Sequence, residues 1–207
     1  MASLYERYVF PWLISCACSA KPIAKQRAKV VPQASGRVLE LGMGSGLNLP
    51  FYDPSKVSEV AAVEPSKELR DKANAAAATA GVKVALQDGR AEALPYDAAS
   101  FDCVVCTFTL CSVQDPAASL AESRRVLKPG GRLLFCEHGL APDPDVVKWQ
   151  RRIEPFWTPF AGGCHLTRPV GKSIQAAGFH VTKLDTMYLP GAPRWAGWNE
   201  WGEATPA

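Results

Sequence analysis

Short apolar runs alternate with longer segments of helical periodicity along most of the chain. The apolar runs occupy residues 37–41, 59–63, 82–87, 101–107 and 132–136, and the helical segments occupy residues 48–52, 66–80, 115–127, 145–160 and 167–177. A closing pair of strands is expected at residues 180–188 and 195–203, joined by a loop rich in proline and glycine. Strands that alternate with helices predict βαβ units around a parallel sheet.

Several predicted helices begin or end at residues that are common at helix termini. Ser66 is placed to cap the helix over residues 66–80, and Gly81 is placed to end it. Thr167 is expected to cap the helix that it begins, and the Lys-Pro-Gly-Gly run at residues 128–131 is expected to close the helix before it.

A glycine-rich turn follows the first predicted strand. It reads Gly42-x-Gly44-x-Gly46, with Glu40 just upstream, and Glu64 ends the second strand. Glycines let the backbone approach a ligand closely, and an acid at the tip of the next strand can bind both ribose hydroxyls. The pattern therefore indicates a nucleoside site. The plainer alternative is a turn that only joins a strand to a helix.

The glycine spacing narrows the choice of ligand. Dinucleotide reductases usually carry G-x-G-x-x-G, but residue 47 is leucine, and no Lys-Ser/Thr pair follows as in a P-loop. A turn without a phosphate cradle suits a nucleoside whose other end is not a phosphate, and S-adenosylmethionine is such a ligand. The absent third glycine also argues against a nicotinamide-dependent reductase.

Ligands of open α/β sheets bind at the carboxyl ends of the strands, so residues at or beside these ends are the candidates. Residues 88–92 can offer backbone amides and a carboxylate to an adenine ring, which Leu94 and Leu110 could sandwich. For the acid in this segment, a solvated loop position is the alternative. The expected cofactor-binding residues are Glu40, Gly42, Gly44, Gly46, Asn48, Glu64, Pro65, Gly89, Arg90, Ala91, Glu92, Thr107 and Cys111.

Composition limits the class of protein. The 207 residues are 47% apolar, which suits one sizeable α/β domain, and we expect a monomer or a dimer. The net charge of +3 is spread along the chain, which argues against a nucleic-acid partner. The spacing of the seven cysteines suits neither a disulfide scaffold nor a metal site. Cys103 and Cys106 would point to opposite faces of a strand, so we expect free buried thiols in a reducing cytoplasm.

Residues 1–35 are expected to form an amphipathic helical segment, and residues 36–207 a single ligand-binding domain. The aromatic side chains of Tyr5, Tyr8, Phe10 and Trp12 would cover the ligand site as a lid or rest on a membrane surface. The apolar run is too short to span a bilayer. Plain packing in the core is the alternative.

Taken together, the motifs resemble those of class I S-adenosylmethionine-dependent methyltransferases. The matching segments are residues 39–46, 63–65, 91–96, 100–102 and 124–131. The resemblance implies a Rossmann-like seven-stranded sheet, mostly parallel with the last strand antiparallel, with helices on both faces and an N-terminal helical lid. It also implies that S-adenosylmethionine is the methyl donor.

A narrower resemblance is to the methyltransferase-like alkyl thiol methyltransferases. It is carried by residues 106–114, 137–138 and 162–168, and it implies a small, apolar thiol as methyl acceptor. His138 and His165 are the candidate catalytic residues, since a histidine near the site can take the proton of a thiol. The residues expected around the acceptor are Tyr8, Trp12, Trp149, Trp157, Cys164 and Arg168.

For these acceptor-side residues, structural roles are the alternative: hydrogen-bonded histidines, packed cysteine and tryptophan, and an arginine that caps carbonyls. The residues also leave open an amine, hydroxyl or carbon acceptor, on a lipid headgroup, quinone or other small molecule. A module that binds the cofactor without catalysis is a further alternative.

Overall fold

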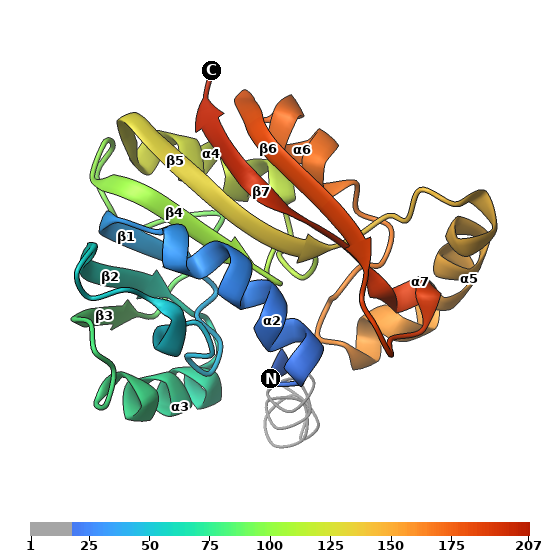
Figure 1. The fold of residues 1–207 in the computed structure, drawn as a ribbon, viewed down its shortest axis with the longest axis horizontal. Helices are drawn as coiled ribbons and strands as arrows, with labels where there is room; N and C mark the ends of the chain where they lie inside the picture. The colour runs from blue at the N-terminus through green and yellow to red at the C-terminus, as the bar shows by residue number, and fades with distance from the viewer. Residues whose placement is uncertain (1–17) are drawn as a thin grey trace.

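Seven strands form one sheet through the centre of the protein (Figure 1). The computed structural model describes residues 18–207. The strands are β1 (Gly36–Leu41), β2 (Val57–Val63), β3 (Val84–Gln87), β4 (Phe101–Thr107), β5 (Leu127–His138), β6 (Phe179–Tyr188) and β7 (Trp198–Pro206). Their order is β3-β2-β1-β4-β5-β7-β6. Strands β1 to β5 pair in parallel, whereas β7 runs antiparallel to both neighbours, which confirms the expected fold class.

Helices cover both faces of this sheet. They are α2 (Lys21–Val30), α3 (Lys67–Ala77), α4 (Pro116–Val126), α5 (Pro144–Phe160), α6 (Val170–Ala176) and α7 (Arg194–Gly197), with short 3-10 turns η2 (Val31–Gln33) and η3 (Leu49–Phe51). α2 and α3 pack on one face, and α4 and α6 pack on the other (Figure 1). α5 follows the carboxyl end of β5 and lies beside α7.

Side chains that alternate along the strands build two apolar layers. In one layer, Ala73 of α3 packs in the same cluster as Cys103. In the other layer, Leu120 of α4 packs in the same cluster as Cys106. The two cysteines therefore face opposite sides of β4, as the sequence predicted. The six cysteines of residues 18–207 are all free thiols.

Two of the predicted helix caps can be compared with the structure. The cap of α3 is confirmed, because the hydroxyl of Ser66 accepts a hydrogen bond from the Leu69 amide at 3.3 Å. The cap predicted at Thr167 is wrong. α6 begins only at Val170, and the Thr167 hydroxyl donates to Glu154 at 2.8 Å instead. The Thr167 hydroxyl thus binds the Glu154 carboxylate of α5 and does not cap α6.

Other element boundaries also differ from those predicted. Residues 128–131 lie inside β5 rather than in a loop, and residues 194–197 form α7 before β7 begins. α3 ends at Ala77, ahead of Gly81. Within residues 18–207, every helix is too short or too polar to cross a lipid bilayer.

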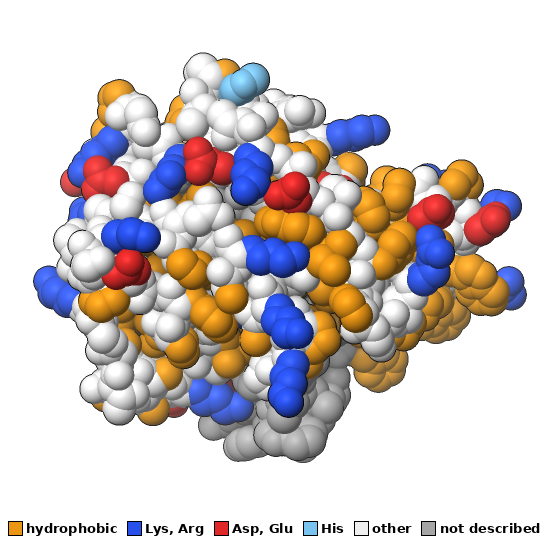
Figure 2. Space-filling model, viewed as in Figure 1, with side chains coloured by type: hydrophobic (Ala, Val, Ile, Leu, Met, Phe, Trp, Pro, Cys, Tyr) orange, Lys and Arg blue, Asp and Glu red, His pale blue; other side chains and the backbone are white. Residues whose placement is uncertain are grey.

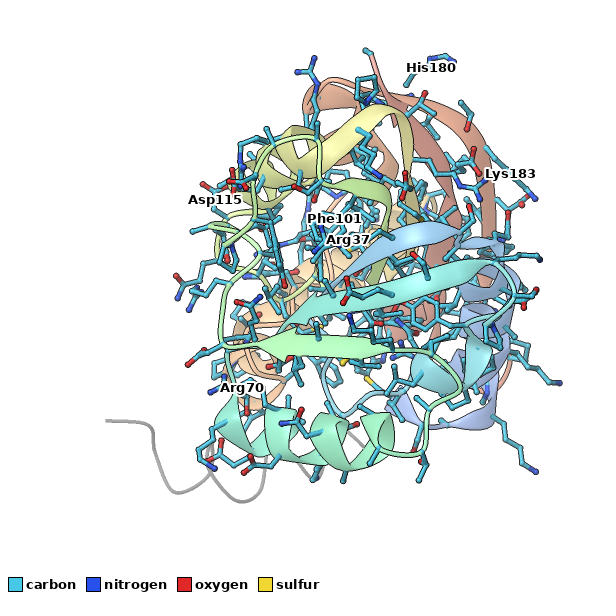
Figure 3. The ribbon with its side chains drawn as sticks, turned by 90° about the vertical axis from the view of Figure 1, so that its left-hand side faces the viewer. Arg37, Arg70, Phe101, Asp115, His180 and Lys183 are labelled. Carbon is cyan, nitrogen blue, oxygen red and sulfur yellow. The ribbon has the colours of Figure 1, made fainter. Side chains whose placement is uncertain are left out.

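The carboxyl ends of the parallel strands meet at one edge of the sheet. Arg70, in the first part of α3, and Asp115, before α4, lie toward this edge (Figure 3). His180 is the second residue of β6 and lies at the opposite edge (Figure 3). The fold therefore brings the segments after β1 to β5 together and leaves His180 outside the candidate site.

Candidate cofactor and acceptor site

A cavity of about 280 Å³ opens at the carboxyl ends of β1, β2 and β4. Most of the cofactor-binding residues expected from the sequence line it: Gly42, Gly44, Glu64, Pro65, Gly89, Arg90, Ala91, Glu92 and Thr107. The remaining four, which are Glu40, Gly46, Asn48 and Cys111, are not among the lining residues. The strand ends chosen from the sequence thus meet around one space.

The glycine turn after β1 brings backbone close to that space. Gly42 and Gly44 both have positive φ, 63° and 59°, which glycine adopts without strain. A Cβ at Gly42 would lie 2.7 Å from Cγ2 of Thr109, so the turn can pack there only without a side chain. A Cβ at Gly44 would meet no atom within 4 Å, because this residue faces open space. A ligand can therefore approach the backbone at Gly44.

Glu64 ends β2 with its carboxylate fixed beside the turn. One oxygen accepts from the Gly44 amide and the other from the Ser66 amide, each at 2.9 Å. Burial raises the pKa of Glu64, although both amides act in the opposite direction. Each oxygen has a second lone pair available, so the carboxylate can still accept two hydrogen bonds from a ligand.

Glu40 lies beneath the turn and not in the cavity. Its carboxylate accepts from Asn48 at 3.0 Å and from the Tyr52 hydroxyl at 2.7 Å, and only 2% of the residue is exposed. Burial raises the pKa of Glu40 to about 7. The expected direct contact of Glu40 and Asn48 with a ligand is thus replaced by a supporting role. The backbone folds over them, and their polar groups are already paired.

Arg27 of α2 is a cavity residue that the sequence analysis missed. Its Nη1 donates to Oδ1 of Asn48 and to Oγ1 of Thr107, both at 2.7 Å, and its Nε is buried without a partner. A signal was present in the sequence. Arg27 lies four residues after Ile23 and three before Val30, so it occupies a position of the apolar face of α2.

The segment after β3 forms another wall of the cavity. Glu92 accepts from the Gln114 amide at 2.7 Å, which joins this segment to the loop after β4. Burial alone would raise the pKa of Glu92, but the backbone hydrogen bonds outweigh it and lower the pKa. The expected adenine sandwich is corrected, because Leu94 and Leu110 pack in the core below α4. The apolar walls come from Leu69, Val113 and neighbouring residues instead.

Glu137, at the end of β5, fixes the loop that follows β4. This fully buried carboxylate accepts from the amides of Thr109, Leu110 and Cys111 at 2.7, 3.1 and 3.4 Å. The loop shapes the far end of the cavity, since Thr109 and Ser112 line it. The carboxylate one residue before His138 therefore binds the backbone of the loop after β4.

His138, Cys164 and Cys111 come together, and none of the three lines the cavity, although Cys111 is next to the lining residue Ser112 in the sequence and Cys164 follows the lining residue Gly162 by two positions. Nε2 of His138 lies 3.0 Å from Sγ of Cys164, and the side-chain nitrogen and sulfur atoms of the three residues all lie within 4.8 Å of one another. Burial alone would lower the pKa of His138, but Cys164 and Glu137 outweigh it and raise the pKa. The contact with Cys111, together with burial, raises the pKa of Cys164.

The loop that carries Cys164 is docked against β5. A Cβ at Gly139 would clash with the carbonyl oxygen of Arg168, which accepts from the Leu140 amide at 2.9 Å. The Arg168 side chain donates to the Leu110 carbonyl. Arg168 therefore joins the loops after β4 and α5, and it is not one of the cavity-lining residues.

The second candidate histidine is held outside the cavity. Nδ1 of His165 lies 3.2 Å from Glu154, whose other oxygen accepts from the Leu166 and Thr167 amides at 2.7 Å. Burial alone would raise the pKa of Glu154, but these hydrogen bonds outweigh it and lower the pKa. His165 thus contacts a carboxylate of α5, in line with the structural alternative.

The aromatic residues expected around the acceptor separate into two groups. Trp157 is partly buried, and its Nε1 donates to Sγ of Cys164 at 3.3 Å. Trp149 does not line the cavity, because it lies on the outer face of α5 and is 57% exposed, while the adjacent Gln150 faces inward. The surface over α5 is correspondingly rich in hydrophobic side chains (Figure 2). Tyr8 and Trp12 lie outside the described residues.

The comparisons with known proteins agree with this geometry. Residues 39–135 match the family model of a methyltransferase domain. The thiol S-methyltransferase TMT1B of Mus musculus is 37% identical over 170 residues, which cover 78% of this chain and 67% of that protein. The chain belongs to the class I S-adenosylmethionine-dependent methyltransferases. The methyl donor of this family is S-adenosylmethionine.

One further sequence relative and one solved structure show how far the similarity extends. TMT1B of Rattus norvegicus is 38% identical over 160 residues, covering 74% of this chain and 64% of that protein. The chain thus spans about two thirds of the length of these relatives. An S-adenosylmethionine-dependent methyltransferase of Thermotoga maritima, described as a possible histamine N-methyltransferase, has a TM-score of 0.66. It covers 98% of both chains at 22% identity, a likeness of fold alone.

Proposed function

We propose that this methyltransferase transfers the methyl group of S-adenosylmethionine to a small, apolar thiol. The observation that carries the proposal is the likeness to thiol S-methyltransferase TMT1B over most of the chain. The chemistry of the acceptor end of the cavity supports it independently, as does the fit of the cofactor end to a nucleoside.

The cofactor end fits S-adenosylmethionine in three respects. The free lone pairs of Glu64 would bind the two ribose hydroxyls, and the open backbone at Gly44 would receive the amino-acid part. Residues 89–92 would flank the adenine ring. Thr107 and the loop after it, which also line the cavity, would then lie on the side of the methyl group. S-adenosylmethionine supplies an activated methyl group when it is bound, and the protein supplies position and exclusion of water.

The charges at the acceptor end favour a thiol over a cationic amine. The two carboxylates on this side, Glu137 and Glu154, are already engaged by backbone amides. A protonated amine would therefore find no free counter-ion among the described residues there. Arg27 lines the cavity, and Arg168 lies close to Cys111 and Cys164. Positive charge of this kind stabilises a thiolate.

Transfer between two sulfur atoms needs alignment and a deprotonated acceptor. A thiolate is a strong nucleophile, so the protein has to orient it and remove its proton. A free thiol has a pKa of about 8.5, and most of it is protonated near neutral pH. We propose that His138, at the end of β5, activates the acceptor thiol. His165, paired with Glu154, would hold the wall of the acceptor site.

The test is a panel of acceptors offered with isotopically labelled S-adenosylmethionine. A small alkyl thiol, an amine of similar size and a phenol would be compared at equal concentration. We expect label in the thioether product of the thiol. Transfer to the amine or phenol without transfer to the thiol would overturn the proposal. Tight cofactor binding without transfer to any member would support the non-catalytic alternative.

A further inference from the structure

Three potential metal ligands converge at the acceptor end, although they are far apart in the sequence. Cys111 follows β4, His138 ends β5, and Cys164 lies between α5 and α6. Their ligand atoms all lie within 4.8 Å of one another. The sequence predicts no metal site, because the spacing of its cysteines does not suit one. We propose that these three residues bind a thiophilic divalent cation, Zn²⁺, and leave one coordination position open.

The separations suit a small shift into a tetrahedral site. Zinc bonds of about 2.3 Å to sulfur and 2.0–2.1 Å to nitrogen place the sulfur atoms about 3.8 Å apart and each sulfur about 3.6 Å from the nitrogen. The distance of 3.0 Å between His138 and Cys164 would lengthen, and the widest separation, at most 4.8 Å, would shorten by no more than about 1 Å. Two thiolates and one imidazole form a donor set that selects Zn²⁺ over the harder Mg²⁺ and Ca²⁺.

The surroundings hold each ligand in place. The Cys111 amide donates to Glu137, and its carbonyl accepts from the His165 amide at 2.8 Å. His138 is paired with Asn199 in the ladder between β5 and β7. Trp157 donates to Sγ of Cys164 at 3.3 Å, a hydrogen bond of the kind that supports a metal-bound thiolate. The half-buried Arg168 guanidinium lies close to both sulfur atoms and offsets their negative charge.

Three protein ligands and one open position are the arrangement of a catalytic zinc site. The role of the open position rests on the proposed thiol methylation, whereas metal binding does not. An acceptor thiol would enter there and release its proton to solvent as its sulfur binds the metal, so His138 would activate the thiol as a ligand of the metal and not as a base. That sulfur then donates an electron pair to the methyl carbon. The bond from this carbon to the donor sulfonium breaks, its electron pair stays on the donor sulfur, and a neutral thioether and S-adenosylhomocysteine result.

Metal binding is tested first on the full chain, kept reduced throughout. The protein is stripped with a chelator and titrated with Zn²⁺ and with Co²⁺ as a spectroscopic probe. We expect one equivalent to bind, with thiolate-to-cobalt absorption in the near ultraviolet and visible bands of a tetrahedral ion. The absence of stoichiometric Zn²⁺ binding to folded protein would overturn the proposal.

Variants then assign the ligands. Cys111→Ser, Cys164→Ser and His138→Asn should each weaken Zn²⁺ binding by about 100-fold or more, and Trp157→Phe by roughly 10-fold. Two variants serve as matched controls. Cys136→Ala removes a buried thiol in the apolar layer beneath α2 and α3, and His180→Asn changes a histidine at the edge of the sheet away from the cavity. Retained S-adenosylhomocysteine binding shows that each variant is folded. Equal losses in ligand and control variants would overturn the assignment.

The open position is tested with the acceptor. Adding a small alkyl thiol to the Co²⁺ protein should change the cobalt spectrum, and Zn²⁺ should raise the rate of thiol methylation at least 10-fold over the stripped protein. Methylation of thiols at full rate without metal would overturn the role of the site and leave the proposed function intact. Stoichiometric metal binding with no methylation of any thiol would contradict the proposed function and leave the metal site intact.

Discussion

The Glu64 carboxylate accepts a hydrogen bond from the Gly44 amide at 2.9 Å, across 20 positions of the sequence. This contact joins the tip of β2 to the turn after β1. It orients the carboxylate, and it also fixes the glycine whose open side faces the cavity. The two most informative residues of the sequence motif are therefore parts of one unit.

Replacement of Glu64 tests this unit directly. Glu64→Ala should weaken S-adenosylhomocysteine binding by roughly 10- to 150-fold, because hydrogen bonds to a charged acceptor contribute about 1.5–3 kcal/mol. Isothermal titration calorimetry gives the affinity. Asp71→Ala, an exposed acid on α3, is the matched control and should bind normally. An unchanged affinity in Glu64→Ala would show that the ribose lies elsewhere.

We expect Arg27, which lines the cavity, also to stabilise the folded protein. Arg27→Met keeps an unbranched apolar stem but loses the contacts to Asn48 and Thr107. We expect the free energy of unfolding to fall by about 1–3 kcal/mol, measured by urea denaturation. Lys25→Met, on the exposed side of the same helix, should change it by less than about 0.5 kcal/mol. Equal effects of the two substitutions would contradict the role assigned to Arg27.

Because of Glu40, we expect the free energy of unfolding to fall as pH rises. Burial raises its pKa to about 7, from an ordinary value of 4.5, so the folded state binds this proton more tightly than the unfolded state. Its contribution is fully present below the lower value and is lost as pH rises through the higher one. In the ligand-free protein, Glu40→Gln should remove up to about 3 kcal/mol of this decline.

Urea denaturation between pH 4 and pH 8 measures that decline. Parallel curves for Glu40→Gln and the parent protein would show that Glu40 does not hold a proton in the folded state.

His138 should affect turnover in a pH-dependent manner. His138→Asn is expected to lower kcat mainly below the acceptor pKa of about 8.5, where the thiol has to be activated, and less above it. Rates of methyl transfer from pH 6 to pH 10 give this profile. His180→Asn, at the other edge of the sheet, should follow the parent profile. A pH-independent loss in His138→Asn would indicate a structural role only.

Gly139 allows the cofactor and acceptor ends to be separated. In Gly139→Ala, the new Cβ would meet the Arg168 carbonyl and displace the loop that carries Cys164. We expect methyl transfer to fall at least 10-fold while S-adenosylhomocysteine affinity changes little. Gly81→Ala has space at its Cβ and should leave both properties unchanged. A joint loss of binding and turnover would mean that the two ends are not independent.

The sequence predicted the cofactor half of the site better than the acceptor half, for a physical reason. Gly42, Gly44 and Glu64 lie at strand ends, and parallel strands bring such ends together whatever the loops do. Cys111 and Cys164 meet because Glu137 holds the loop after β4 and Glu154 holds the loop after α5. No local sequence pattern predicts contacts of this kind. The cap at Thr167 was wrongly predicted for the same reason, because the Thr167 hydroxyl donates to Glu154 instead.

The local sequence also could not predict which side chains of α5 are exposed and which are buried. Trp149 and Gln150 invert the usual preference, because the glutamine amide donates to the Gly139 and Trp195 carbonyls and its oxygen accepts from the Ala141 amide. A buried glutamine of this kind is stable only when all of its polar atoms are paired. The tryptophan is left on the outside, where hydrophobicity alone would not place it.

The position of β7 between β5 and β6 has a consequence for the order of synthesis. β1 to β4 and the glycine turn leave the ribosome early, and they can form the nucleoside-binding half from neighbouring βαβ units. The partner of His138 in the ladder is Asn199, which is translated 61 residues after it. A nascent chain that has not reached β7 therefore holds a strand edge open beside β5. The strand ends proposed to bind the cofactor are therefore translated first, and the strand pairing around His138 is completed only by β7.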